Sequence, residues 1–299
     1  MSRRARLVMI LSLLVLACGP AAPVGAQVAG QGGGAGLVQD GATASAGLLR
    51  ALDMPGMIAV MRDEGLAYGL DLETGLFGAP GDVEPIANAR WRAEVARIYD
   101  ADRMTSALTS ALDAELPPDL VPEMTAFFTT PLGKRIVALE ISARKALLDQ
   151  EVEDASRAAL DKMRADRHPR LAVLGAFIAA GDLLEANVAG ALNANLAFYQ
   201  GMLDGVAFPD PVGQDQAIAD VWAQETEIRT ETEHWLYSYL GMAYQPLSDA
   251  DLDAYVAFSA GAAGKALNRA LFAAFDTMFT GISRDLGLGA ARYLSGQDI

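Results

Sequence analysis

The two histidines of this sequence are its strongest candidates for metal ligands. His234 follows Glu231 at the Glu-x-x-His spacing that places both side chains on one helix face, as in helical di-iron proteins. Such a site needs a second pair, but Ala165 stands three residues before the other histidine, His168. We therefore expect no metal site, and we interpret the segment around Glu231 as a solvated acidic helix face.

Acidic side chains are the remaining candidates for catalysis. Glu225 and Glu227 could act as a proton donor and acceptor in an acid-dependent hydrolase. The sequence has no Gly-x-Ser-x-Gly motif and no zinc-binding pattern, and Gly133-Lys134 lacks the earlier glycine and the following Ser or Thr of a phosphate-binding loop. We expect no catalytic residue, no cofactor and no enzyme activity; the hydrolase is the alternative with the least support.

The second half of the sequence repeats the first at a fixed offset of 131 residues, without a gap. Rare residues such as tryptophan would seldom coincide in one register by chance. The pattern therefore predicts a tandem duplication of one unit. The matched pairs are Tyr68 and Tyr199, Leu72 and Leu203, Phe77 and Phe208, Pro80 and Pro211, Trp91 and Trp222, Glu94 and Glu225, Leu116 and Leu247, Ala126 and Ala257, Phe127 and Phe258, Gly133 and Gly264, and Lys134 and Lys265.

Six of the matched residues are candidates for binding: Tyr68, Tyr199, Lys134, Lys265, Glu94 and Glu225. Each lysine follows a glycine near an expected helix start, where the helix dipole disfavours a cation, so it could meet an acidic partner. The alternative is a surface lysine that extends into water. A tyrosine hydroxyl could lie at the wet end of a groove. Each glutamate could be a buried acid beside a tryptophan, although a salt bridge within a helix is commoner.

Helices must position these residues, because apolar residues recur at helical spacing and no useful alternating run appears. Thr130-Pro131 predicts a helix start, with Thr as the N-cap, and the helix is expected to run to about Ala165. Trp91 and Trp222 are expected to be core anchors. Further predicted stripes contain Leu49, Leu52, Ile58 and Met61; Val95, Ile98, Leu108 and Leu112; and Leu267, Leu271, Ala274 and Met278.

The predicted fold is all-α, with two tandem, internally duplicated helical domains. Residues 48–167 form the first repeat and residues 168–299 the second, with the boundary at the polar segment around His168 and Pro169. About 130 residues in each repeat would suffice for a separate core. Residues 27–47 are rich in Gly, Ala, Ser and Gln, and they are expected to form a flexible linker.

The N-terminal residues predict export. Residues 1–26 combine a basic start, an apolar stretch and a small-residue cleavage site that ends at Ala26. Cys18, the single cysteine, follows a sequence that resembles a lipobox, so a lipoprotein signal over residues 1–17 is the alternative. The chain is expected to be periplasmic or exported, or else a lipoprotein anchored at the membrane by its lipid. The net charge of −15 disfavours nucleic acid as a partner.

The segment Phe127-Phe128-Thr129-Thr130-Pro131-Leu132-Gly133-Lys134-Arg135 resembles the signature of a bacterial exported family, domain of unknown function 2059. That signature is an aromatic pair, Ser or Thr before Pro, and then Gly-Lys at the start of an apolar helix. The second copy, around Phe258 and Gly264-Lys265, keeps the first aromatic residue and the Gly-Lys pair, but it lacks the second aromatic residue and the proline. The resemblance implies an all-helical exported domain with no assigned reaction.

These observations predict a non-enzymatic protein that binds a protein or another envelope component through the surface between its two repeats. The alternative is a periplasmic carrier of a small apolar ligand, because duplicated helical units can enclose a cavity. A carrier predicts a large apolar cavity. A binding module predicts exposed apolar surface, and an enzyme predicts facing carboxylates in one pocket.

Overall fold

The computed structural model describes residues 38–77, 85–206 and 213–295. These residues form helices joined by turns and contain no strand, which confirms the all-α prediction. The helices are α1 (Val38–Ala51), α2 (Met54–Phe77), α3 (Pro85–Ile98), α4 (Ala101–Glu115), α5 (Val121–Thr129), α6 (Pro131–Ala146), α7 (Gln150–Ala165), α8 (Arg170–Ala180), α9 (Leu183–Asp204), α10 (Gln214–Trp222), α11 (Glu225–Ala243), α12 (Asp249–Ala260) and α13 (Ala262–Leu294).

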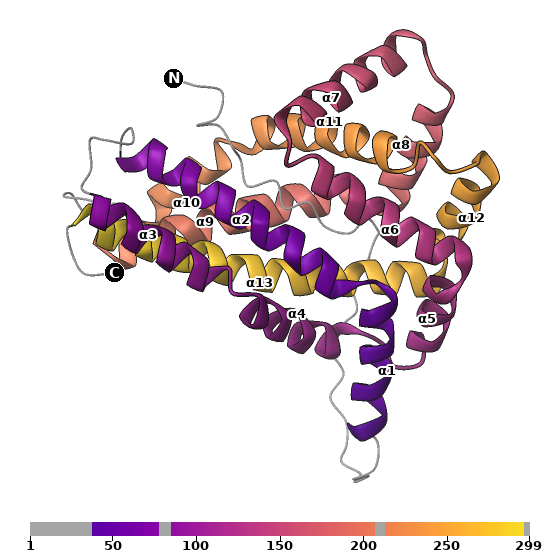
Figure 1. Ribbon diagram of the computed structural model, residues 1–299, viewed down its shortest axis with the longest axis horizontal. Coiled ribbons are helices and arrows are strands. Elements are labelled where there is room, and N and C mark those ends of the chain that lie inside the picture. Colours follow the sequence, from indigo (N-terminus) through magenta and orange to yellow (C-terminus); the bar gives the residue numbers. More distant parts are fainter. Residues whose placement is uncertain (1–37, 78–84, 207–212, 296–299) are drawn as a thin grey trace.

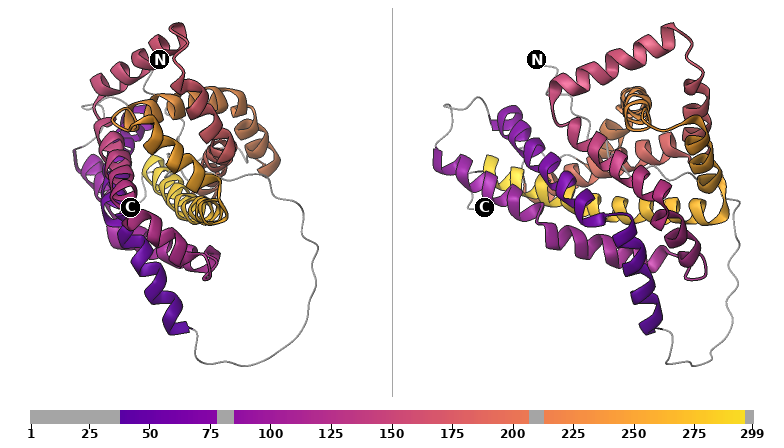
Figure 2. Two further views of the ribbon diagram at one scale, coloured as in Figure 1. Left: turned by 90° about the vertical axis from the view of Figure 1, so that its right-hand side faces the viewer. Right: turned by 45° about the vertical axis from the view of Figure 1, so that its right-hand side comes forward.

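Helix α13 is the central element of the bundle. It is 33 residues long and contacts α3, α4, α5, α9 and α12. Figure 1 shows it running straight along the long axis of the molecule. In the left view of Figure 2, the indigo and magenta helices of the first half gather on the left, and the orange and yellow helices of the second half lie on the right.

Helices α9 and α13 approach until their backbones touch. A Cβ atom at Gly287 would lie 2.0 Å from the carbonyl oxygen of Phe198, and one at Gly201 would lie 2.1 Å from that of Arg284. Both distances are far below a van der Waals contact. Only glycine therefore fits at these two positions, and the pair of helices has one possible register.

Helix starts follow the capping residues in the sequence. The Thr130 hydroxyl accepts a hydrogen bond from the amide of Gly133 at 3.0 Å, and Ser248 caps α12 in the same way through Asp251. The predicted start at Thr130-Pro131 is confirmed. The predicted run to Ala165 is wrong, because α6 ends at Ala146 and Asp149 caps a new helix, α7.

After this break, α7 turns back along α11 instead of continuing in the direction of α6 (Figure 1). Arg157 of α7 bonds Glu231 of α11 at 3.3 Å. The remaining predicted stripes are buried as expected, including Leu267, Leu271 and Ala274 of α13.

The predicted linker over residues 27–47 overlaps the first helix, so that prediction is wrong for residues 38–47. Helix α1 packs on α5, and Leu48 in its last turns and Leu52 directly after it are buried in the core. Burial of this apolar end explains why a segment of mostly small residues is helical. Residues 27–37, like the predicted targeting segment with Cys18, lie outside the described residues.

The two predicted halves share one large hydrophobic core, and a smaller cluster around Val188, Val221 and Ile228 lies within the second half. Phe127 of α5 stacks on Phe258 of α12, with ring centroids 3.9 Å apart and planes 8° apart. Buried side chains of α4, α6, α11 and α13 belong to the large core. The boundary near residue 168 remains a prediction and falls in the turn between α7 and α8.

Among the described residues, no single helix has both the length and the apolar composition needed to cross a membrane. Helices α8 and α9 meet these two limits only as a pair, and they are bent by 57° relative to each other.

The contact between α9 and α13 leads to a test with two glycine-to-alanine changes in one helix. Gly287→Ala should destabilise the protein by about 1–3 kcal/mol, because the new methyl group would overlap the Phe198 carbonyl. Gly281→Ala, on the same helix but with no atom within 4 Å of its Cβ, should stabilise by up to about 1 kcal/mol through helix propensity. Urea unfolding midpoints measure both. Shifts of the same sign would contradict the packing described for α9 and α13.

Candidate functional site

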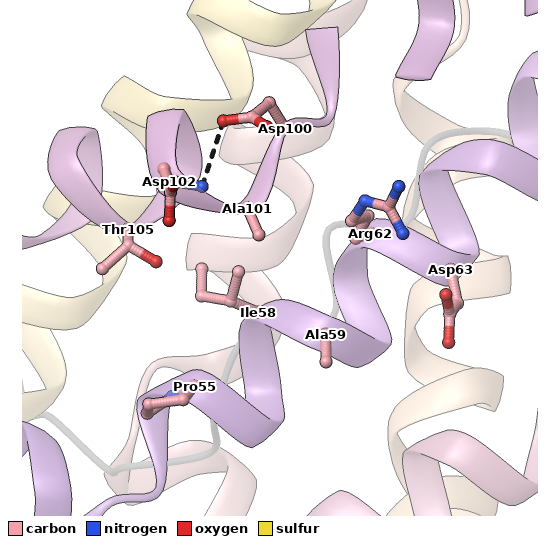
Figure 3. Close-up of a pocket in the computed structure, with 9 residues that line it drawn as sticks. All are labelled: Pro55, Ile58, Ala59, Arg62, Asp63, Asp100, Ala101, Asp102 and Thr105. Carbon is pink, nitrogen blue, oxygen red and sulfur yellow. Dashed lines mark hydrogen bonds between the residues drawn. The ribbon is translucent and has the colours of Figure 1, made fainter. Parts of the chain in front are cut away.

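A cleft of about 530 Å³ lies between the first turns of α2 and of α4 (Figure 3). Both helices belong to the first half of the chain. The cleft is open to solvent and mixes charged, polar and small apolar groups. Its lining residues are Pro55, Ile58, Ala59, Arg62, Asp63, Asp100, Ala101, Asp102 and Thr105.

One carboxylate of the cleft is already committed to the fold. Asp100 is the N-cap of α4, and its Oδ1 accepts hydrogen bonds from the amides of Asp102 at 3.1 Å and Arg103 at 3.0 Å. Ile58 is buried with 2% of its surface exposed, so it forms an apolar floor. The cap therefore holds the α4 side of the cleft in place over that floor.

Arg62 is the cation of the cleft, and it has no hydrogen bond or ion pair with another described residue. It is half-buried on α2. Figure 3 shows Arg62 on one side, Asp102 and Thr105 on the other, and Ile58 and Ala101 between them. Three other arginines of the first half are paired, as Arg92 is with Glu73, Arg97 with Glu94 and Arg144 with Glu64. A guanidinium without a partner can bind a carboxylate or a phosphate from outside the chain.

A second polar cluster is buried where α6 meets α11 and α12. The Glu140 side chain is fully buried, and its Oε1 accepts hydrogen bonds from the hydroxyls of Tyr244 at 2.6 Å and Tyr255 at 3.1 Å. The Tyr239 hydroxyl donates to the Glu140 carbonyl at 3.2 Å. Oε2 of Glu140 has no hydrogen-bond partner. This carboxyl lies away from solvent, so a substrate would reach it only if these helices opened.

An ion pair extends this cluster toward α2. Arg144, one turn after Glu140, is buried with 4% of its surface exposed, and it donates to both carboxylate oxygens of Glu64 at 2.7 and 2.6 Å. Burial acts to lower the pKa of Arg144, but the charge and hydrogen bonds of Glu64 outweigh that effect and raise it. The pair joins α6 to α2.

Burial also shifts the ionisation of the cluster itself. It raises the pKa of Glu140 to about 7, against the lowering effect of the hydrogen bonds from Tyr244 and Tyr255. The pKa values of both tyrosines are well above 10, first because of burial and then because of the charge on Glu140. The cluster can take up and release one proton near neutral pH.

The matched tryptophans differ completely in their surroundings. Trp91 is fully buried, and its Nε1 donates to the carbonyl oxygen of Gly69 at 2.8 Å, as expected of a core anchor. Trp222 ends α10 with 62% of its surface exposed, so the same prediction is wrong for this residue.

The two glutamates form salt bridges within their helices, as expected for the commoner arrangement. Glu94 pairs with Arg97 at 2.6 Å, and this hydrogen bond lowers the pKa of Glu94. Glu225 pairs with Arg229 at 2.6 Å.

The predicted tyrosines and lysines do not come together at the cleft either. Tyr68 is half-buried and burial raises its pKa to about 12, whereas Tyr199 lies 3.4 Å from Asp220. Lys134 is exposed and Lys265 is half-buried. The residues that line the cleft include none of the six predicted binding residues.

Two features escaped the sequence-based prediction for different reasons. Arg62 matches Asn193 in the second half, so the repeat gave no signal for it. Glu140 matches Leu271 and follows Ile136 at a spacing of four, so it stands on the apolar face of its helix. A charged residue on that face could have been recognised as a buried acid.

The surroundings of His234 agree with a polar helix surface. Its Nδ1 lies 3.4 Å from Arg157, which also bonds Glu231, and its Nε2 lies 3.7 Å from Asp161. In the described part of the chain, no three His, Cys, Asp or Glu side chains are placed to hold a metal ion.

The raised pKa of Glu140 predicts a pH-dependent stability. The folded protein holds this proton more tightly than the unfolded chain, whose glutamate has a pKa near 4.5. The stabilisation is therefore complete below pH 4.5 and is lost as the pH rises to about 7, a change of roughly 3 kcal/mol. Glu140→Gln should remove this dependence. The free energy of unfolding of the variant, measured in urea, should therefore rise relative to that of the wild type between pH 5 and pH 8. Glu123→Gln, at an exposed position of α5, is the control. An unchanged difference between Glu140→Gln and wild type at both pH values would contradict the assignment.

Comparison with known proteins gives one partial match. Searches of curated proteins and of solved structures return no match. A family model described as "Uncharacterized protein conserved in bacteria (DUF2059)" matches residues 102–162, from the start of α4 into α7. The match covers one copy, and a second copy of the family unit stays a prediction. The segment 102–162, with the Thr130-Pro131 helix start at its centre, is therefore similar to this uncharacterised bacterial family.

Proposed function

We propose that this chain is a non-enzymatic, exported binding protein, built from two copies of one helical unit, whose cleft between α2 and α4 receives an anionic group of a partner protein or envelope component. Its N-terminal sequence supports export, to the periplasm or to the membrane through a lipid on Cys18. The unpaired Arg62 in the cleft is the observation that carries the binding proposal.

Recurring helix positions support the duplication. The ends of α5 and α12, at Thr129 and Ala260, are 131 residues apart, and so are the starts of α6 and α13, at Pro131 and Ala262. Helix contacts in the first half recur between the matched helices of the second half. Helix α1 packs on α5, and α8 packs on α12. Helix α2 packs on α3, and α9 packs on α10; α5 packs on α6, and α12 packs on α13.

The matched glycines also make the same contact. A Cβ at Gly133 would lie 2.3 Å from the carbonyl oxygen of Phe127, and one at Gly264 would lie 2.4 Å from that of Phe258. These two phenylalanines are themselves a matched pair. Each glycine thus allows the same close approach of two successive helices in its own half.

The cleft replaces the surface between the halves as the proposed binding site. Between the halves lie buried side chains of the shared core, including the stacked Phe127 and Phe258. The cleft is open, and its charged residues are Arg62, Asp63, Asp102 and the helix cap Asp100. This lining suits a charged ligand better than a small apolar one, and Arg62 is the group in it that can attract an anion. Glu225, the acid proposed for a hydrolase, is held by Arg229, which also favours binding over hydrolysis.

A single cysteine placed in the cleft tests the proposal. Thr105→Cys would carry a thiol-linked photocrosslinker, and no other reactive thiol competes, because Cys18 is either removed with the signal or lipidated. Irradiation of the cell envelope should give a discrete adduct. Adding Arg62→Gln should reduce that adduct about tenfold, since a charged hydrogen bond to the ligand is lost.

Ser110→Cys, exposed on the same helix but outside the cleft, is the matched control and should give no such adduct. Thermal unfolding of the Arg62→Gln variant checks that its fold is intact. Adducts that are the same from both cysteines, or that persist at full yield in Arg62→Gln, would refute binding at the cleft.

A further inference from the structure

The two matched tryptophans have different neighbours because one is covered by a helix and the other is not. The last third of α13 lies over Trp91: Tyr293 meets its ring edge-on with centroids 6.2 Å apart, and a Cβ at Gly289 would lie 3.5 Å from it. In the second half, Trp222 is 62% exposed. Within residues 38–77, 85–206 and 213–295, no helix covers Trp222 as α13 covers Trp91.

The course of α7 explains this difference. Helix α13 continues straight past the position where α6, its counterpart, ends at Ala146 (Figure 1). The first half has to connect to the second, so α7 turns back along α11 and leads into α8 at Arg170. The second half needs no such return, and α13 continues over α3 and α9.

Two more exposed hydrophobic residues match positions that are on α13 or touch it. Leu70, 46% exposed on α2, matches Gly201, which touches the backbone of α13. Leu148, 43% exposed at the break between α6 and α7, matches Phe279, which is 6% exposed on α13. Together with Trp222, these residues mark one missing helix, since each counterpart belongs to α13 or packs against it.

We propose that the surface around Trp222 binds an amphipathic helix of a partner protein, in the place that the last third of α13 occupies over Trp91. This inference rests on the duplication in the proposed function but not on the cleft. Small residues of the bound helix would face the indole, as Gly289 faces Trp91.

The charges around the site define the rest of the partner's chemistry. Acidic residues flank the exposed hydrophobic ones in sequence: Asp215, Asp220 and Glu227 near Trp222 on α10 and α11, and Asp71 next to Leu70 on α2. This acidic border favours a helix with Lys or Arg beside its small residues. The last third of α13 has two arginines and one acid around its small residues: Arg284, which pairs with Asp204 at 2.7 Å, and Asp285 precede them, and Arg292 follows them.

Among the described residues, two segments of this chain could be considered as occupants, and both are poorly placed. Helix α7 ends at Ala165 and α8 begins at Arg170, so a short connection joins them. This connection keeps α7 from reaching α10 while α8 stays in place. The end of α13 already lies on α3 and α9 of its own chain. A helix from another protein therefore fits best.

The fold itself supplies the probe for a binding experiment. A lactam-stabilised peptide with the sequence of residues 281–295, labelled with a fluorophore, should bind the full chain in an anisotropy titration. Trp222→Ala should weaken binding at least tenfold, because tryptophans dominate such contacts. The peptide change Gly289→Leu should weaken it similarly. Leu294→Ala, an exposed leucine on α13, is the control variant and should leave the affinity unchanged.

Three outcomes would overturn the proposal. They are no binding at peptide concentrations on the order of 1 mM, binding that Trp222→Ala leaves unchanged, and self-association of the chain that Trp222→Ala abolishes, which would make a second copy the occupant. Arg62→Gln should not affect peptide binding. If the crosslink at the cleft is absent but the peptide binds, the proposed function fails and this inference stands. If the crosslink forms but the peptide does not bind, this inference fails and the proposed function stands.

Discussion

The backbone contact between α9 and α13 is the constraint on which the rest of the structure depends. Gly201 and Gly287 let the two helices meet without intervening side chains, which fixes their register. Helix α13 can then contact α3, α4, α5 and α12 at once and join the two halves around one core. No disulfide contributes, because the sequence has a single cysteine, so this close packing has to supply the rigidity.

A consequence of the shared core is that the two halves no longer need the same residues inside it. Glu140 is buried between α6 and the second half, whereas its counterpart Leu271 is a buried apolar residue of α13. A buried carboxyl is costly unless its oxygens are hydrogen-bonded, and Tyr244 and Tyr255 satisfy only Oε1. The unsatisfied oxygen shows that this contact favours a specific arrangement of α6 on α11 and α12 over maximal stability.

Local features of the sequence predicted the helices. Features that depend on contacts between helices could not be predicted in this way. Thr130 and Ser248 start helices by capping their own first turns, so a short segment suffices to recognise them. The break after Ala146 has a local signal in Asp149, which caps α7, but the return of α7 along α11 depends on contacts between these two helices. Arg62 lies in a cleft between two helices that no local pattern brings together.

In the duplication that we propose, the two copies differ where their last helices end. Helix α6 ends at Ala146 and the chain returns through α7 to α8, whereas α13 continues past the matched position. This difference buries Trp91 and leaves Trp222 in water. A large exposed aromatic side chain favours association and contributes nothing to the core, so the packing of this chain alone does not account for a tryptophan at position 222. The partner helix that we propose would account for it, since indole rings supply much of the binding energy where two proteins meet.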